Sequence, residues 1–362
     1  MRRSEVAEAV RSLQERIGRS PNMAKHNPSP KQPALSESLF ADAFVRRPER
    51  LGGVPAGALP AVTDRTVVNV SKVPQRSPLR YPGGKTWLVP HIRLWLRSLD
   101  PQPRELVEPF AGGAIVGLTA AFEGLATHVT LVELDENVGA LWQTILNGDA
   151  QKFADDVVRF DLSLDTVRSV LAAPNNTQYQ RAFATLLKNR VQRGGILAPG
   201  ASLMKLGENG RGIASRWYPQ TLRRRILAIA SLRDRITFVQ GDGIEFLKNS
   251  AARPDVAYFL DPPYTKAGRR LYAYSVIDHA RLFEVAASLV GDFLMTYDDA
   301  PEIRLLAEKH GFDTEVIAMQ NTHLAKKTEL LIGRNLDWAR LSRPVIPRLA
   351  LHPAQGHTLF RA

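Results

Sequence analysis

The chain has 362 residues, of which 44% are hydrophobic, so it is long enough for one large α/β domain or two ordinary ones with a sizeable core. It contains no cysteine, which excludes disulfides, thiolate metal sites and cysteine nucleophiles and fits a reducing cytoplasm. The formal net charge of +12 favours a polyanionic partner, although a basic, well-solvated protein has the same composition.

Residues 1–74 differ in composition from the rest of the chain. Apolar residues recur at helical spacing within the first twenty residues, which predicts a short amphipathic helix. A stretch rich in Pro, Ser, Gly and Ala follows, so we predict a largely disordered arm over 1–74 and, from its prolines, a second loose tail over 336–362. The chain start lacks the apolar region of a secretory signal, and no stretch approaches the ~18 apolar residues of a membrane span. We therefore expect a cytoplasmic protein without membrane segments.

Between these ends, short apolar runs alternate with helical patterns. The predicted strands are 105–107, 128–132, 236–239, 256–260 and 292–295, and the clearest predicted helices are 113–122, 137–146 and 280–289. This alternation predicts a mostly parallel sheet that is covered by helices on both faces. The segment 148–234 interrupts the alternation with helices and a Gly/Arg-rich loop. We interpret it as an insertion into an α/β core formed by 75–147 and 235–335.

The first motif in chain order is Arg80-Tyr81-Pro82-Gly83-Gly84-Lys85. A glycine pair followed by lysine predicts a tight loop that presents one ammonium group to a ligand. The four-residue spacer between the glycines of a phosphate-binding P-loop is missing. Taken alone, the motif indicates only a loop.

The second motif, Val107-Glu108-Pro109-Phe110-Ala111-Gly112-Gly113-Ala114, lies between a predicted strand and a predicted helix. Its glycines allow a ligand to approach the backbone, and the helix start exposes free N–H groups. The spacing differs from the dinucleotide fingerprint, which argues against NAD. About twenty residues later the next strand ends at Glu133, where an acid can accept both hydroxyls of a ribose. The alternative for Glu133 is a solvated acid at a strand end.

The most specific motif is Asp261-Pro262-Pro263-Tyr264, which follows the predicted strand 256–260 directly. Ligands of open α/β sheets bind at such strand ends. The Asp261 carboxylate and the Pro262 carbonyl match the two N–H groups of an exocyclic amino group, whose delocalised lone pair makes it a poor nucleophile. Tyr264 offers a ring on which an extruded base can stack. A capped proline turn is the alternative, but the tetrapeptide should occur by chance in only about one such chain in a thousand.

In this order, the motifs resemble those of the Dam-like class of adenine-specific DNA methyltransferases, over roughly 75–335. The resemblance implies a Rossmann-like S-adenosylmethionine-dependent methyltransferase core with an inserted, largely helical target-recognition domain at 148–234. It implies that a methyl group passes from S-adenosylmethionine to N6 of adenine in double-stranded DNA, by base flipping and direct in-line transfer. The resemblance implies a role in DNA methylation, as in restriction–modification, and leaves open whether a partner restriction enzyme exists.

The resemblance also implies roles for individual residues. It makes Asp261, Pro262 and Tyr264 catalytic residues that hold the flipped adenine. The residues implied at the cofactor are Tyr81, Lys85, Glu108, Phe110, Gly112, Gly113, Glu133 and Asp242. The segment 327–332 resembles the closing strand of the fold. In the insertion, Asn189 and Arg190 resemble a DNA-contacting pair and Arg193 is a further DNA-binding candidate. The residues that follow differ from the GATC-reading version, so the target sequence stays open, and no metal site is predicted.

Two alternatives remain. The same cofactor fold also serves methylation of RNA or of a protein amide, but protein glutamine methyltransferases typically begin the last motif with Asn and lack the glycine–lysine loop. A catalytically silent DNA-binding protein on this fold would be expected to lose Asp261 or the glycine turn, and both are intact. Methyl transfer itself separates these classes.

Overall fold

The computed structural model describes residues 73–81, 83–264, 277–319 and 327–341. The described residues all belong to one compact unit, and residues 19–66 lie outside them. The predicted N-terminal helix, almost all of the predicted arm and most of the predicted C-terminal tail also lie outside them. In the part of the chain that is described, no helix combines the length and apolar character needed to cross a membrane.

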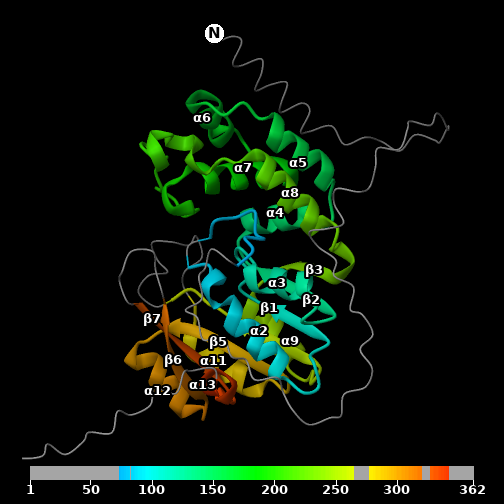
Figure 1. The fold of residues 1–362 in the computed structure, drawn as a ribbon, viewed down its shortest axis with the longest axis vertical. Coiled ribbons are helices and arrows are strands. Elements are labelled where there is room, and N and C mark those ends of the chain that lie inside the picture. The colour runs from blue at the N-terminus through cyan, green and yellow to red at the C-terminus, as the bar shows by residue number, and fades with distance from the viewer. Residues whose placement is uncertain (1–72, 82, 265–276, 320–326, 342–362) are drawn as a thin grey trace, which may run out of the picture. The chain divides into compact units, whose positions relative to one another are not determined.

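A seven-stranded sheet forms the centre of the described unit, with strand order β3-β2-β1-β4-β5-β7-β6 (Figure 1). The strands are β1 (Glu105–Glu108), β2 (His128–Glu133), β3 (Ile236–Gln240), β4 (Val256–Leu260), β5 (Asp292–Asp298), β6 (Asp313–Met319) and β7 (Lys327–Gly333). The first five pair in parallel, whereas β7 runs antiparallel to both β5 and β6. The mostly parallel sheet expected from the sequence is confirmed, and β6 is a strand that the sequence analysis did not predict.

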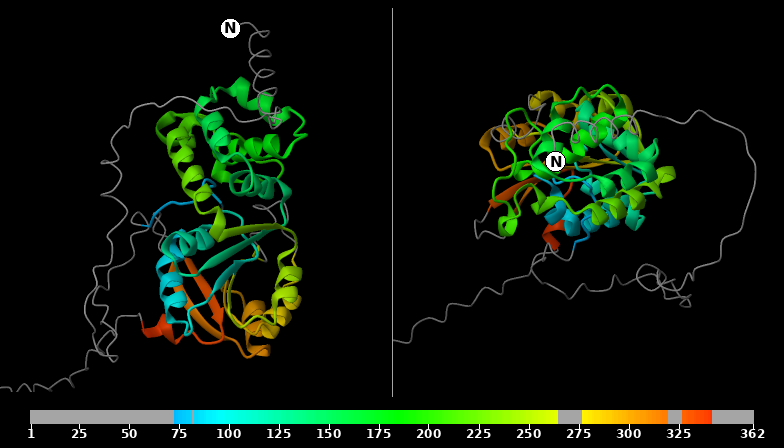
Figure 2. Two further views of the ribbon diagram at one scale, coloured as in Figure 1. Left: turned by 90° about the vertical axis from the view of Figure 1, so that its right-hand side faces the viewer. Right: turned by 90° about the horizontal axis from the view of Figure 1, so that it is seen from above.

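Helices cover both faces of the sheet, as Figure 2 shows. One hydrophobic cluster joins one face to α2 (Val89–Ser98), α3 (Ile115–Glu123) and α13 (Asp337–Leu341). The other joins the opposite face to α9 (Gly243–Ser250), α11 (His279–Ser288) and α12 (Pro301–Lys309). Strands β1 and β4 are buried along their whole length, as expected of central parallel strands between two helical layers.

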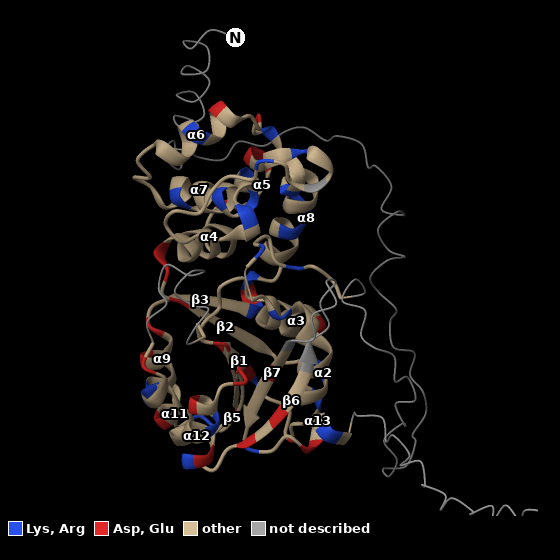
Figure 3. Ribbon diagram, turned by 90° about the vertical axis from the view of Figure 1, so that its left-hand side faces the viewer, with Lys and Arg blue, Asp and Glu red and all other residues tan. Residues whose placement is uncertain are grey.

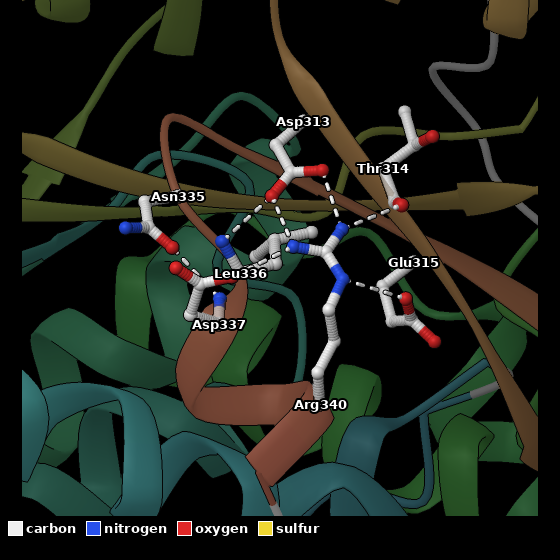
Figure 4. Close-up of polar contacts among 7 residues, drawn as sticks. All are labelled: Asp313, Thr314, Glu315, Asn335, Leu336, Asp337 and Arg340. Carbon is white, nitrogen blue, oxygen red and sulfur yellow. Dashed lines mark hydrogen bonds and ion pairs between the residues drawn. The ribbon is translucent and has the colours of Figure 1, made fainter.

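Arg340 fixes α13 against the edge strand β6 (Figure 4). Its guanidinium donates to both oxygens of Asp313, at 2.5 and 2.7 Å, and to Glu315 at 3.2 Å. Asp313 also accepts the backbone N–H of Leu336 at 2.9 Å. The ion pair lowers the pKa of Asp313 and raises that of Arg340. This anchor orders the last described helix on an edge strand of the sheet.

Residues 148–234 form a set of helices between β2 and β3. They are α5 (Ala150–Arg159), α6 (Leu164–Ala172), α7 (Gln178–Val191), α8 (Pro219–Ala230) and the short 3-10 turns η4 (Arg193–Gly195), η5 (Glu208–Gly210), η6 (Gly212–Arg216) and η7 (Arg233–Arg235). Capping boxes at Ser163 and Thr177 start α6 and α7. Helix α4 (Glu136–Leu146) packs on both the sheet and these helices. The ring of Trp217 packs edge-on against Phe160, so Trp217 is a core residue.

Candidate active site

Four of the parallel strands are followed or terminated by an acidic residue at one edge of the sheet. Glu108 ends β1 and Glu133 ends β2, while Asp242 and Asp261 follow β3 and β4. The strand order reverses between β1 and β4, and ligands of open α/β sheets bind at that point, beyond the carboxyl ends of the strands.

A pocket of about 330 Å³ lies at this edge. Among the residues that line it are all of those expected at the cofactor, together with the first residue of the Asp-Pro-Pro-Tyr motif: Tyr81, Lys85, Glu108, Phe110, Gly112, Gly113, Glu133, Asp242 and Asp261. Its volume is at the lower end of the range for small-molecule sites, about 300–1,000 Å³. The structure thus brings three motifs that are far apart in the sequence to one cavity.

The glycine turn after β1 has a backbone that requires glycine. Gly112 has a φ of +46°, and a Cβ there would lie 2.6 Å from the Tyr81 ring. The backbone of Gly112 is held on both sides, because its N–H donates to Glu133 at 2.8 Å and its carbonyl accepts from Trp142 at 3.0 Å. The turn therefore holds Tyr81 against its backbone, where the ring forms one wall of the pocket.

Glu108 is buried beneath the first turn of α3. Its Oε2 accepts the backbone N–H of Gly117 at 2.7 Å. Burial raises the pKa of Glu108 to about 8, and the nearby charge of Asp261 acts in the same direction. The hydrogen bond from the Gly117 N–H and the charge of Lys85 both lower this pKa but do not cancel the effect of burial. Glu108 is therefore largely neutral near pH 7 in the ligand-free protein.

Glu133 and Asp242 hold the backbone around the pocket. Burial raises the pKa of Glu133 to about 6, although Glu133 accepts the backbone N–H groups of Asp135 and Gly112, both at 2.8 Å. Asp242 begins α9 by accepting the N–H groups of the first turn, at 2.7 and 3.1 Å. A Cβ at Gly243 would lie 2.1 Å from the Pro109 carbonyl, so the start of α9 packs directly on the glycine turn.

Asp261 lies in a cluster of polar side chains beside the pocket. The Lys85 ammonium is 2.9 Å from Asp261 Oδ1 and donates to the Gly83 carbonyl at 2.9 Å. The same oxygen of Asp261 accepts the Thr296 hydroxyl at 2.8 Å. The Lys85 side chain is only 3% exposed, whereas that of Asp261 is 22% exposed. Lys85 and Thr296 thus fix one carboxylate oxygen of a group that still reaches solvent.

Tyr264 and Pro262 do not line the pocket in this structure. The Tyr264 hydroxyl donates to Glu329 Oε1 at 3.1 Å, and its ring stacks on Tyr297 with a centroid distance of 5.8 Å. Lys85 Nζ lies 5.0 Å from the centre of the Tyr264 ring. Pro262 is buried directly after Asp261.

Glu329 and Thr296 belong to this cluster and were not among the residues expected from the sequence. Glu329 lies on β7, whose antiparallel direction brings its early residues to the edge where β4 and β5 end. Glu329 Oε1 is 3.7 Å from Lys85 Nζ. The one feature of the sequence that could have indicated Glu329 is its position as an acid directly before the apolar run Leu330-Leu331-Ile332.

The structure places the expected DNA-contacting pair in the interior. Asn189 is 1% exposed, and its side chain bonds the N–H and carbonyl of Arg80, at 2.8 and 3.1 Å, and the Gly195 carbonyl at 2.7 Å. Arg190 is 4% exposed and donates to the Pro78 carbonyl, and burial lowers its pKa to about 9. Because these groups bond backbone atoms, both residues anchor segment 78–80 instead of facing a ligand. Arg193 is exposed.

Comparison with protein families identifies the segment that forms most of this pocket. Residues 81–170 match the family model of the D12 class N6 adenine-specific DNA methyltransferases. The protein is a methyltransferase. The match confirms the resemblance to adenine-specific enzymes and includes the glycine turn, Glu133 and all but the first residue of the glycine–lysine loop. It ends before the Asp-Pro-Pro-Tyr motif.

Solved structures of methyltransferases are similar to this chain, at low identity and low TM-score. They include the rRNA methyltransferase aviRa from Streptomyces viridochromogenes (14% identity, covering 74% of this chain and 93% of that chain, TM-score 0.31). Precorrin-6y C5,15-methyltransferase from Geobacter metallireducens GS-15 has 12% identity, coverages of 67% and 84%, and a TM-score of 0.30. The M1A22 tRNA methyltransferase TrmK from B. subtilis has 10% identity, coverages of 70% and 67%, and a TM-score of 0.29. At these values the likeness identifies no substrate, and no curated protein matches the sequence.

The family match implies S-adenosylmethionine as the methyl donor of this methyltransferase. The chemistry of the pocket fits such a ligand. Carboxyl groups from three strand ends suit a cation and a ribose, and the glycine turn lets a ligand approach the backbone.

We expect the affinity of the methyltransferase for S-adenosylmethionine to rise between about pH 6 and 8, by up to tenfold per pH unit. A cationic ligand favours the ionised form of Glu108, so it binds more tightly as the pH approaches the raised pKa of about 8. Isothermal titration calorimetry measures this dependence. The affinity for S-adenosylhomocysteine, which lacks the sulfonium charge, should depend less steeply on pH. In Glu108→Gln the affinities for the two ligands should show the same dependence on pH. Equal slopes for both ligands in the unaltered protein would contradict the assignment.

Proposed function

We propose that this methyltransferase transfers the methyl group of S-adenosylmethionine to the N6 amino group of adenine in double-stranded DNA. The observation that carries the proposal is the Asp261 carboxylate, which is fixed at the end of β4 by Lys85 and Thr296 beside the pocket. The family match supports adenine as the target.

Asp261 and Pro262 supply the acceptors that this reaction needs. One oxygen of Asp261 is held by Lys85 and Thr296, so the other is left to accept one N–H of the adenine amino group. The Pro262 carbonyl accepts the second. Two fixed acceptors favour a more tetrahedral nitrogen, whose lone pair can attack, and positioning supplies much of the rate.

The pocket residues hold the methyl donor beside these acceptors in our proposal. Tyr81, Phe110, Gly112 and Gly113 would surround its methionine part, with Glu108 compensating positive charge, Glu133 on the ribose and Asp242 near the adenine ring. The bound cofactor supplies an electrophilic methyl group on a sulfonium. Lys85 orients Asp261, and the chain itself forms no covalent bond to the methyl group.

The charge of the inserted helices supports a nucleic-acid partner. Residues 178–225 contain ten Lys or Arg residues and a single acid, Glu208. Of the ten, Lys188, Arg190 and Arg225 bond backbone carbonyls, and Arg181 and Arg223 pair with acids. Many of these charges fall on α7, α8 and the loops between them (Figure 3). Neutralising backbone phosphates with such charges releases counterions and favours binding. We propose 148–234 as the target-recognition domain and 75–147 with 235–335 as the catalytic core.

We expect the purified protein to produce N6-methyladenine in unmethylated bacterial double-stranded DNA supplied with S-adenosylmethionine. Mass spectrometry of the digested nucleosides measures the product, and total RNA treated in parallel is the control substrate. Methyl transfer to RNA alone, or to neither nucleic acid by a protein that binds the cofactor, would reject the DNA assignment.

A further inference from the structure

Glu329 is buried in the centre of the site but has no part in the proposed chemistry so far. It is 4% exposed. Its Oε1 accepts the Tyr264 hydroxyl at 3.1 Å and lies 3.7 Å from Lys85 Nζ. Among the described residues, its buried Oε2 has no hydrogen-bond partner.

Such a carboxyl is a costly residue for the fold. Burying an incompletely paired charge destabilises a protein, and a glutamine or an apolar residue of similar size would avoid that cost. Burial raises the pKa of Glu329 to about 7. Lys85 lowers this pKa, whereas the charge of Asp261 raises it. Stability therefore gives no reason for an acid at this position.

The Lys85 ammonium lies between two carboxyl groups. It is 2.9 Å from Asp261 and 3.7 Å from Glu329. When both acids are ionised, these three groups together carry one net negative charge. That charge is beside Asp261, where the attacking nitrogen would become positive.

We propose that Glu329 is a positioning residue of the methyl transfer: it holds Lys85 against Asp261 and takes up, through Lys85, the proton that leaves N6. This inference rests on the proposed function. It assigns Glu329 a role in the same reaction without direct contact to adenine.

The proton balance of the step closes within these three residues. The N6 lone pair forms the new C–N bond as the C–S bond breaks and leaves its electron pair on sulfur. N6 then carries a positive charge and loses one proton to Asp261. Lys85 gives one proton to Glu329 and then takes the proton from Asp261, so Lys85 ends the step as an ammonium group. Glu329 releases its proton to solvent once the product has left.

Several other ionisable groups share the surroundings of Glu329. The groups that shift its pKa are Lys85 at the start of η3 (Lys85–Leu88) and Asp261 and Tyr264 after β4. Asp298 is paired with Glu329 across the β5–β7 ladder. On β6 the paired residue is the apolar Ile317. Of the groups named, only Lys85 carries a positive charge.

The first measurement is the thermal stability of Glu329→Gln against pH, without cofactor or DNA. A raised pKa means that the folded protein holds a proton that the unfolded chain releases, so wild type loses stability as the pH rises from about 4.5 to 7. We expect the variant to be spared this loss and to melt a few degrees above wild type at pH 8. A variant that is less stable than wild type at pH 8, or that fails to fold, would make Glu329 a structural residue and overturn the proposal.

The second measurement is methyl transfer by the same variant on DNA. We expect kcat to fall about 100-fold, with the KM for DNA changed less than about threefold, because Glu329 acts on the proton and not on binding. The rise of the wild-type kcat through about pH 7 should be absent in the variant, and Glu329→Asp should restore part of the rate. Glu315→Gln, at a carboxyl paired with Arg340, is the matched control and should behave as wild type.

The outcomes separate this inference from the proposed function. Wild-type kcat and an unchanged pH profile in Glu329→Gln would overturn the inference and leave the proposed function intact. A wild type that methylates no DNA would reject the proposed function. The stability measurement reports on the buried acid in either case.

Discussion

Replacing Asp261 by asparagine lowers the rate of methyl transfer by about 100- to 1,000-fold and leaves the fold and the cofactor affinity close to those of wild type. The substitution keeps the shape of the side chain but removes its charge and one of its two acceptor oxygens. Asparagine can still accept from Thr296, but it cannot also accept from N6 and balance Lys85. Removing one fixed partner of a transition state costs about this much in other enzymes.

Single-turnover kinetics, with DNA and S-adenosylmethionine both saturating, measure this effect apart from binding. Asp255→Asn is the matched control, because Asp255 directly precedes the same strand and pairs with Arg253 on the surface. A rate in Asp261→Asn within about tenfold of wild type would show that Asp261 is not an essential acceptor, and would move the search to Glu108 and Glu329.

The parts of the site that the sequence predicted share one property: each depends on local sequence. Glu108, Glu133 and Asp261 follow apolar runs whose length and composition mark them as buried strands, and parallel strands bring their carboxyl ends to one edge. The position of these acids therefore follows from recognising each strand separately.

The parts that the sequence did not predict depend on pairing between distant segments. Strand β6 begins with the polar residues Asp313-Thr314-Glu315 at the edge of the sheet, so only its second half, residues 316–319, is apolar. Glu329 reaches the site only because β7 is antiparallel, and direction cannot be inferred from one strand alone. Two of the three backbone groups that Asn189 bonds belong to Arg80, 109 residues away, so its burial could not be foreseen from a resemblance to DNA-contacting residues.

Asn189→Ala is expected to destabilise the protein by about 3–5 kcal/mol, the largest stability effect among the substitutions considered. The side chain bonds three backbone groups: the N–H and carbonyl of Arg80 and the carbonyl of Gly195. Alanine would leave them without these bonds in the interior, and each unsatisfied buried group costs about 1–3 kcal/mol, with incomplete additivity. Chemical denaturation measures the loss.

The same substitution should impair catalysis through the loop that Asn189 holds. Segment 77–80 is fixed to the inserted helices by Asn189, by Arg190 on Pro78 and by Arg225, which donates to the Ser77 carbonyl at 3.0 Å. That segment leads directly into Tyr81 and Lys85. Loosening it moves two walls of the site at once, so methyl transfer should fall even under conditions where the variant remains folded.

Arg193→Ala supplies the contrast that separates anchoring from DNA contact. Arg193 lies in the same region as Asn189 but is exposed, so its removal should change stability by less than about 0.5 kcal/mol. If Arg193 meets a phosphate, the variant should bind DNA more weakly and with a salt dependence reduced by about one charge. If only Asn189→Ala loses stability, the buried amide serves the fold. If only Arg193→Ala loses affinity for DNA, the exposed arginine contacts the substrate. A stable, fully active Asn189→Ala protein would instead mean that the inserted helices hold the glycine–lysine loop by other contacts.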